Sequence, residues 1–229
     1  QPRSRGLGDV YKRQLRAGPA GLDAAPVVSD APAWDARYDA EGFTFGEQPN
    51  RYLESMLPRL RPGQSALALG DGEGRNGVWL ARQGLNVTSL DWSATGLAKA
   101  RALAGRHGVA LETVAADLTR WNWPQRRFDL VAWIFVHLPP EDRALVAQRA
   151  VAALAPGGLL VLEGFSPAQE GRRSGGPRDP ALLWTATEAR RLFGGMRLLE
   201  CLDGTVLLDE GPRHQGEAEV VRGLWRQAG

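Results

Sequence analysis

A glycine-rich segment between an apolar run and a helix pattern is the clearest sign of chemistry in this sequence. The segment 70–77 reads Gly-Asp-Gly-Glu-Gly-Arg-Asn-Gly and directly follows the mostly apolar run 65–69. A strand, a glycine turn and a helix let a nucleotide-like ligand lie against bare backbone, because unpaired N–H groups point outward at the helix N-terminus. The next apolar run ends in Asp91, whose carboxylate can accept hydrogen bonds from a ribose. These features predict an adenosine-containing cofactor and leave open which one.

Two cofactors fit this segment. Gly72, Gly74 and Gly77 satisfy the pattern GxGxxG, and Asp91 follows roughly twenty residues after the first of them, as in a site for NAD. A lone GxGxxG is weak evidence, however, and the chain continues differently from a dehydrogenase. An NAD-dependent oxidoreductase is therefore kept as an alternative, and the motifs further along the chain bear on the other cofactor.

Helix and strand patterns alternate from Trp34 onward, which is typical of a parallel sheet covered on both faces. The expected strands are 65–69, 86–90, 109–114, 128–134 and 159–163, with two closing strands at 196–209 and 218–225. The expected helices are 50–60, 75–83, 93–107, 140–154 and 185–193. We expect the closing strands to pair as a hairpin with a long connection. The predicted fold class is α/β, a Rossmann-like doubly wound sheet of seven strands, mostly parallel, with a C-terminal antiparallel hairpin.

The composition is that of a soluble globular domain. The 229 residues are 43% hydrophobic and 24% charged, and no apolar run reaches the length of about 18 residues that a membrane span needs. Lys and Arg exceed Asp and Glu by only two, 28 against 26, so we expect neither nucleic acid nor a membrane as a partner. With a single cysteine, Cys201, and three scattered histidines, we expect a cytoplasmic protein without a metal site.

Two segments differ from the rest of the chain. Residues 1–33 are rich in Gly, Ala, Pro and Arg, without periodicity or the apolar core of a signal peptide. We expect them to be a disordered or non-native extension, and residues 34–229 to form the domain. The Gly-, Pro- and Arg-rich segment 164–180 is too long for a simple connector and is a candidate substrate loop.

Five features in this order resemble the class I S-adenosylmethionine-dependent methyltransferases. They are the glycine segment 69–74, Asp91, the segment Ala116-Asp117-Leu118, the turn 156–158, and the closing hairpin. The resemblance covers most of the chain from Trp34 onward. It implies an enzyme that uses S-adenosylmethionine and releases S-adenosylhomocysteine. Many members carry an acid at the position of Ala68, and its absence removes a polar group that supports the glycine turn.

The resemblance also implies which residues hold the cofactor. The glycine segment would pass close to the methionine part, Asp91 would take the ribose hydroxyls, and Asp117 with Leu118 would hold the adenine. Trp92 directly follows the ribose-binding acid, where side chains flank the adenine ring. The expected cofactor contacts are Gly70, Asp71, Gly72, Gly74, Asn76, Asp91, Trp92, Ala116, Asp117, Leu118 and Ile134.

Two local segments narrow the resemblance. The segments 46–50 and 74–76 look like small microbial methyltransferases of the tellurite-resistance and thiopurine-methyltransferase-like group. This implies a small-molecule acceptor, with a thiol or other soft nucleophile as first choice. Methyl transfer from a sulfonium needs no acid, because the leaving thioether is neutral, and positioning of the nucleophile supplies most of the acceleration. A missing catalytic motif is therefore weakly informative, and a module that binds the cofactor without converting it is a further alternative.

His137 is the candidate catalytic residue, because it follows the strand 128–134 at the carboxyl edge of the sheet, where ligands bind. It would contact the acceptor or act as a general base, and a hydrogen bond to nearby backbone is the structural alternative. The residues expected to line the acceptor pocket are Trp34, Tyr38, Phe45, Trp133, Phe135 and His214. One of Trp133 and Phe135 is expected in the core, because strand side chains alternate between faces. We expect a monomer or a homodimer.

Overall fold

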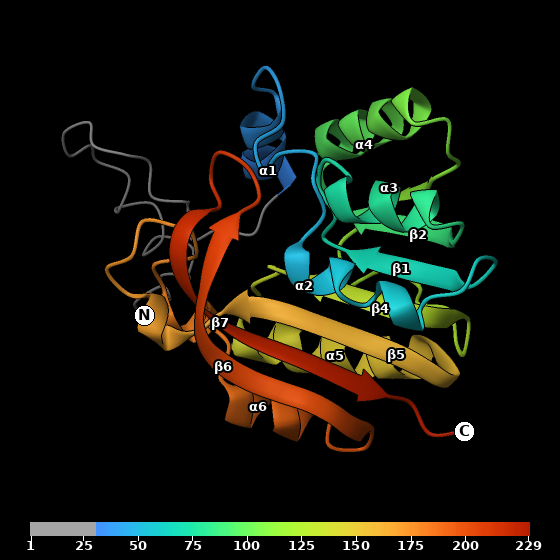
Figure 1. Cartoon of the computed structure of the whole chain (residues 1–229), viewed down its shortest axis with the longest axis vertical. Coiled ribbons are helices and arrows are strands. Elements are labelled where there is room, and N and C mark those ends of the chain that lie inside the picture. Colours follow the sequence, from blue (N-terminus) through green and yellow to red (C-terminus); the bar gives the residue numbers. More distant parts are fainter. Residues whose placement is uncertain (1–30) are drawn as a thin grey trace, which may run out of the picture.

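The computed structural model describes residues 31–229, which form one seven-stranded sheet with helices on both faces (Figure 1). The strand order is β3-β2-β1-β4-β5-β7-β6. The first five strands of this order pair in parallel, whereas β7 is antiparallel to both of its neighbours. The strands are β1 (Ser65–Leu69), β2 (Asn86–Asp91), β3 (Glu112–Ala115), β4 (Phe128–Ile134), β5 (Leu154–Phe165), β6 (Arg197–Asp209) and β7 (Gln215–Arg226). The predicted fold class is confirmed.

The helices divide between the two faces of the sheet (Figure 1). One face carries α2 (Arg51–Glu54), α3 (Arg75–Arg82) and α4 (Ala94–Arg106), and the other carries α5 (Pro140–Ala153) and α6 (Ala186–Leu192). The N-terminal helix α1 (Ala31–Tyr38) packs against α4. The central strand β4 is apolar at nearly every position, because its alternate side chains are buried on opposite faces.

The closing hairpin differs from the prediction. β6 and β7 pair from Arg197 opposite Arg226 to Asp209 opposite Gln215, and only residues 210–214 connect them. The predicted long connection is therefore wrong. β6 ends at residue 209, as predicted, whereas β7 begins at residue 215 and not at 218. Its first residues, Gln215, Gly216 and Glu217, lack the apolar alternation that marks a strand.

Several other boundaries differ from the prediction. The expected helix 50–60 is split, because Pro58 lacks a backbone donor: α2 ends at Glu54, and a 3-10 turn, η3 (Leu57–Arg59), follows. β3 begins only at residue 112, and β5 begins at residue 154, before the predicted turn 156–158. Helix α1 begins at residue 31, inside the range assigned to the N-terminal extension. The expectation for residues 1–30 lies outside the described part of the chain.

Candidate functional site

The loop between β1 and α3 has a backbone conformation that requires glycine. Gly70, Gly72 and Gly74 have positive φ angles of 54°, 54° and 88°, a region that residues with side chains rarely adopt. Neighbouring side chains also occupy the adjacent space: a Cβ atom at Gly70 would overlap Val136 at 2.6 Å, and one at Gly72 would overlap the Tyr38 hydroxyl. The loop therefore presents bare backbone at the carboxyl edge of the sheet.

Asp71 supports this loop from within. Its buried carboxylate accepts hydrogen bonds from the Ser89 hydroxyl at 2.6 Å and from the Gly77 N–H at 3.2 Å. Burial raises the pKa of the Asp71 carboxyl to about 6. These bonds give Asp71 a role in shaping the loop, and its direct contact with a cofactor stays a prediction.

Asp91 ends β2 directly beside the same loop. One carboxylate oxygen accepts a hydrogen bond from the Gly72 N–H at 2.9 Å, and the other accepts one from the Ser93 N–H at 2.8 Å. Burial raises the pKa of this carboxyl to about 6. Each carboxylate oxygen has a second lone pair. The residue thus fits an acceptor of ribose hydroxyls while it holds the glycine loop.

Three aromatic side chains of the N-terminal segment gather next to the glycine loop. The ring centroids are 5.4 Å apart for Trp34 and Tyr38, 6.3 Å for Trp34 and Phe45, and 6.4 Å for Tyr38 and Phe45. Asp35 accepts a hydrogen bond from the Ser93 hydroxyl at 2.6 Å, which fastens α1 to the start of α4. The structure therefore brings together three of the residues that we expected to line the acceptor pocket.

The aromatic cluster continues to the ends of β4 and β5. The ring of His214 lies 4.9 Å from that of Phe45, 4.5 Å from Phe135 and 5.7 Å from Phe165. The His214 ring is only 4% exposed. All but one of the residues expected in the acceptor pocket thus form a continuous row of rings from the glycine loop to the β6–β7 connection.

Trp133 is the residue that lies elsewhere. Its side chain is fully buried on the α5 and α6 side of the sheet. There it packs edge-on against Trp184, with 5.4 Å between the ring centroids, and its Nε1 donates to the Val136 carbonyl at 2.9 Å. Trp133 is therefore the member of the pair that lies in the core, apart from the row of rings. Phe135 lies in a different packing layer, because β4 ends at Ile134 and Phe135 has a positive φ of 53°.

His137 lies next to this row, in the segment after β4. Its Nδ1 is 2.9 Å from the Leu182 carbonyl oxygen, and the Phe165 N–H points to its Nε2 at 3.5 Å. Burial lowers the pKa of His137 to about 4. The ring is thus neutral at neutral pH and donates its Nδ1 proton to the carbonyl. This is the backbone hydrogen bond that we kept as the structural alternative, and a catalytic role stays a prediction.

The residues expected near the adenine follow β3. The Ala116 N–H donates to the Asp91 carbonyl at 2.9 Å, so this segment lies beside the predicted ribose site. The Asp117 carboxylate accepts from both the N–H and the hydroxyl of Thr119 at 2.7 Å, and the Leu118 side chain is buried in the core. Their expected contact with the cofactor stays a prediction.

Three further expected cofactor contacts differ in their surroundings. Trp92 is half-buried, at the end of β2. Ile134 is buried in the cluster on the α2 and α3 side of the sheet. Asn76 is also buried, and its side-chain oxygen accepts a hydrogen bond from the Asn50 N–H at 2.9 Å. Asn76 therefore acts as a structural link within this part of the fold.

A cluster of buried charged residues, which the sequence did not lead us to expect, lies beside the hydrogen bond between Asn50 and Asn76. Glu210 is 1% exposed and pairs with Arg75, the first residue of α3, at 2.8 Å. Asn50 donates from its side chain to Glu210 at 3.0 Å and to Glu163 at 2.8 Å. Glu163 in turn pairs with Arg222 at 3.1 Å. A glutamate at the end of the apolar run 159–163 is the one sequence signal that could have indicated this cluster.

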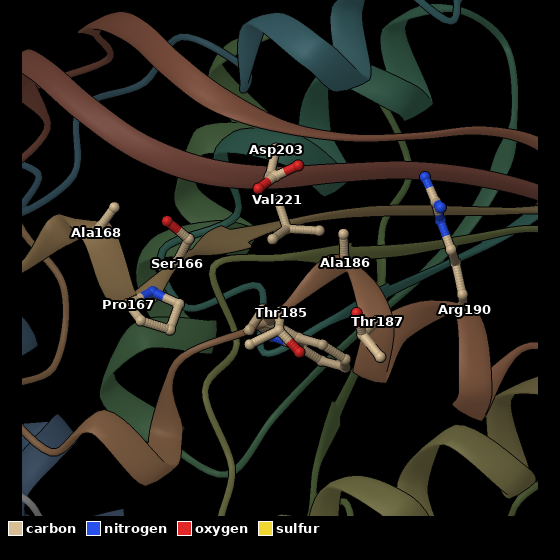
Figure 2. Close-up of a pocket in the computed structure, with 10 residues that line it drawn as sticks. Ser166, Pro167, Ala168, Thr185, Ala186, Thr187, Arg190, Asp203 and Val221 are labelled. Atoms are coloured by element: carbon tan, nitrogen blue, oxygen red, sulfur yellow. The ribbon is translucent and has the colours of Figure 1, made fainter.

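A separate open cleft of about 480 Å³ lies where the start of α6 meets η4 (Pro167–Gln169), β6 and β7 (Figure 2). The cleft is lined by Ser166, Pro167, Ala168, Trp184, Thr185, Ala186, Thr187, Arg190, Asp203 and Val221. It contains none of the predicted site residues. Its one guanidinium, that of Arg190, donates to the Cys201 carbonyl.

Within residues 31–229, no group of three or more His, Cys, Asp or Glu residues could hold a metal ion. None of the helices described here is long and apolar enough to cross a membrane.

The central part of the chain is similar to known methyltransferase domains. Residues 66–158 match the family model described as a methyltransferase domain. The chain is 32% identical over 138 residues to a glycine/sarcosine N-methyltransferase from Halorhodospira halochloris, covering 57% of this chain and 47% of that protein. It is 30% identical over 168 residues to a ribosomal protein L11 methyltransferase from Thermus thermophilus, covering 69% and 63%. A structure solved for the conversion of a disulfide bond into a thioacetal group during echinomycin biosynthesis has a TM-score of 0.69 at 21% identity, covering 86% of this chain and 92% of that one.

The matched segment runs from β1 into β5 and includes the glycine loop and Asp91. This segment is thus similar to a methyltransferase domain, and the structural likeness shows the Rossmann-like fold. A dinucleotide-binding sheet of the classic order 3-2-1-4-5-6 has no antiparallel hairpin of this kind, so the fold does not favour the NAD alternative.

The chain spans less than two thirds of the length of the two curated relatives, and the activity of the whole protein is therefore a proposal.

Proposed function

We propose that this protein transfers a methyl group from S-adenosylmethionine to a small molecule, with a thiol or another soft nucleophile as the acceptor. The observation that carries the proposal is the junction of the glycine loop with Asp91, where the Gly72 N–H donates to the carboxylate at 2.9 Å. Bare backbone and a buried carboxylate at adjacent strand ends are what an adenosine ligand with a charged tail requires.

The residues of the site fit this cofactor. The loop Gly70–Gly74 would hold the methionine part, the Asp91 carboxylate would accept the ribose hydroxyls, and the segment 116–118 would lie beside the adenine. Bound there, S-adenosylmethionine would supply an electrophilic methyl group whose leaving thioether is neutral. The protein's own contribution is then to bind, to orient and to exclude water.

The acceptor would lie along the row of rings next to the glycine loop. Trp34, Tyr38 and Phe45 cover the loop and would keep water away from the reacting atoms. His137 is a weak base, because burial lowers its pKa to about 4. An acceptor that ionises without help, such as a thiol, agrees with these surroundings better than an amine or alcohol that must lose a proton to a strong base.

The identity of the acceptor depends on direct tests, because relatives of this domain differ in substrate. One curated relative is named for glycine and sarcosine and the other for a ribosomal protein. We also propose that the protein belongs to the tellurite-resistance and thiopurine-methyltransferase-like group. This proposal is supported by the segment 46–50, in which the buried Asn50 lies against the start of α3, the helix that follows the glycine loop.

The first test is calorimetric titration of the full chain with S-adenosylmethionine, S-adenosylhomocysteine and NAD. Micromolar binding of the first two, without binding of NAD, supports the proposed cofactor. Incubation with S-adenosylmethionine and a panel of thiols then follows the formation of S-adenosylhomocysteine by mass spectrometry. Binding without any product would favour a module that holds the cofactor but does not convert it, and binding of NAD alone would refute the proposal.

A further inference from the structure

His214 carries a buried polar atom without a hydrogen-bond partner. Its Nδ1 is the only buried side-chain nitrogen or oxygen in the described part of the chain for which the structure provides no partner. Leaving such an atom unpaired costs as much as losing a hydrogen bond, so native proteins rarely tolerate one without a reason. The ring is 96% buried, so bulk solvent does not satisfy this atom.

Three phenylalanine rings pack against the ring, and Arg75 and His137 are the titratable groups that act on it. Phe45, Phe135 and Phe165 enclose it at centroid distances of 4.9, 4.5 and 5.7 Å. An ordered water needs two to four polar partners, and phenylalanine rings supply none. The nearest charged groups of the site are already paired, because Arg75 is held by Glu210 at 2.8 Å.

The position of the ring connects it to the cofactor loop. Phe45 contacts Tyr38, whose hydroxyl packs against Gly72 of the loop. Phe135 follows the end of β4, one residue before Val136, which packs against Gly70. The unpaired nitrogen therefore lies at the far end of a row of rings that begins at the predicted methyl donor site.

We propose that His214 Nδ1 is a specificity-determining contact that hydrogen-bonds a polar group of the methyl acceptor, and that the acceptor has an apolar body and carries no charge other than that of its ionised reacting atom. This inference rests on the proposed function. The apolar part of the acceptor packs against the aromatic rings in place of some of the contacts that they make with one another. A polar group of the acceptor, other than its reacting atom, forms a hydrogen bond with Nδ1. A charged group is disfavoured, because the enclosing rings could not solvate it. Burial lowers the pKa of His214 well below its ordinary value, which keeps the ring neutral.

The test compares two probes that differ in one hydrogen-bonding group, thiophenol and 4-hydroxythiophenol. Calorimetry in the presence and absence of S-adenosylhomocysteine gives their dissociation constants with the full chain. We expect the hydroxyl to tighten binding about tenfold in the wild type, and His214→Phe to abolish this difference without weakening thiophenol. His214→Asn, which keeps a polar atom near the position of Nδ1, should restore part of the preference. A charged thiol, 3-mercaptopropionate, should bind more weakly than either probe.

A structural role alone predicts different results. If Nδ1 has no ligand, His214→Phe removes an unpaired buried nitrogen, raises the melting temperature and leaves both probes unchanged. The matched control is His107→Phe, the same substitution at the exposed C-terminal end of α4, which should leave the binding of both probes unchanged. The ¹⁵N resonance of His214 Nδ1 should shift with 4-hydroxythiophenol and not with thiophenol. Equal binding of both probes to the wild type, or an unmoved resonance, would overturn the proposal, whereas a failure to bind S-adenosylhomocysteine would refute only the proposed function.

Discussion

The affinity for S-adenosylmethionine should depend on the protonation of Asp91. Its carboxylate accepts the Gly72 and Ser93 N–H groups and would also accept the ribose hydroxyls, so the ionised form is the one that binds. Burial raises its pKa to about 6 from the ordinary value of 3.8. Binding should therefore be strong above pH 6 and should weaken as the pH falls below that value.

The size of the effect follows from the pKa. At pH 5, one unit below it, about one carboxyl in eleven is ionised, so the affinity should be about tenfold weaker than at pH 7.5. Hydrogen bonds from the ribose favour the ionised form, and binding near pH 6 should therefore release protons. Asp91→Asn lacks this titration. It should bind the cofactor about 1–3 kcal/mol more weakly at pH 7.5, and its affinity should depend less steeply on pH than that of the wild type, with the remaining dependence coming from Asp71, whose pKa is also about 6.

Calorimetry between pH 5 and 8, in buffers of different ionisation enthalpy, measures both the affinity and the number of protons released. Asp91→Asn is the control for titration of the ligand itself, because the ligand is the same in both experiments. The reasoning would be refuted by a dissociation constant that stays constant from pH 5 to 8 in the wild type, or by the same profile in Asp91→Asn. Stability gives an independent check: the raised pKa means that the native state holds the proton more tightly than the unfolded state. The stability of the wild type relative to Asp91→Asn should therefore fall as the pH rises from about 4 to about 6.

Three substitutions test other parts of the site. Gly72→Ala should weaken cofactor binding at least tenfold, because its Cβ displaces the hydroxyl of Tyr38 packed there. Gly63→Ala, at a positive φ of 85° with open space beside it, should leave the affinity measured by calorimetry unchanged. Glu210→Gln should lower the free energy of unfolding in urea by about 3–5 kcal/mol, because it leaves a buried arginine without its counter-charge. Glu217→Gln on the exposed surface should cost less than about 1 kcal/mol. His137→Gln should reduce turnover of a thiol less than tenfold if the acceptor ionises on its own, and a loss of about a hundredfold or more would show that His137 is a general base.

The elements that follow local rules could be predicted from the sequence. The strand, glycine turn and helix at residues 65–82 and the acid at the end of β2 are set by neighbours in the chain, and the structure has them where the pattern indicates. The alternation of side chains could not separate Trp133 from Phe135, because residues two apart on a strand share a face. They lie in different layers because β4 ends at Ile134 and Phe135 has a positive φ of 53°, and Trp133 packs against Trp184, about fifty residues further along.

The buried charged cluster could not be predicted in this way. Glu210 pairs with a residue 135 positions away, and Asn50 bonds to Glu163 across 113 positions. Taken alone, each of these polar residues is typical of a turn or a solvated surface. The fold brings the β6–β7 connection over the start of α3. Because of this arrangement, these residues are paired and almost completely buried.

That same connection links the two halves of the proposed site. This connection, residues 210–214, contains Glu210, which forms an ion pair with the first residue of α3, and His214, which lies in the row of rings. A buried ion pair gives little net stability over an apolar replacement, so its value here lies in fixing one loop against the other. A displacement of the cofactor loop is then transmitted to the connection through a rigid, fully paired contact. Cofactor binding and acceptor binding should accordingly be coupled, and in Glu210→Gln each ligand should lose its effect on the affinity of the other.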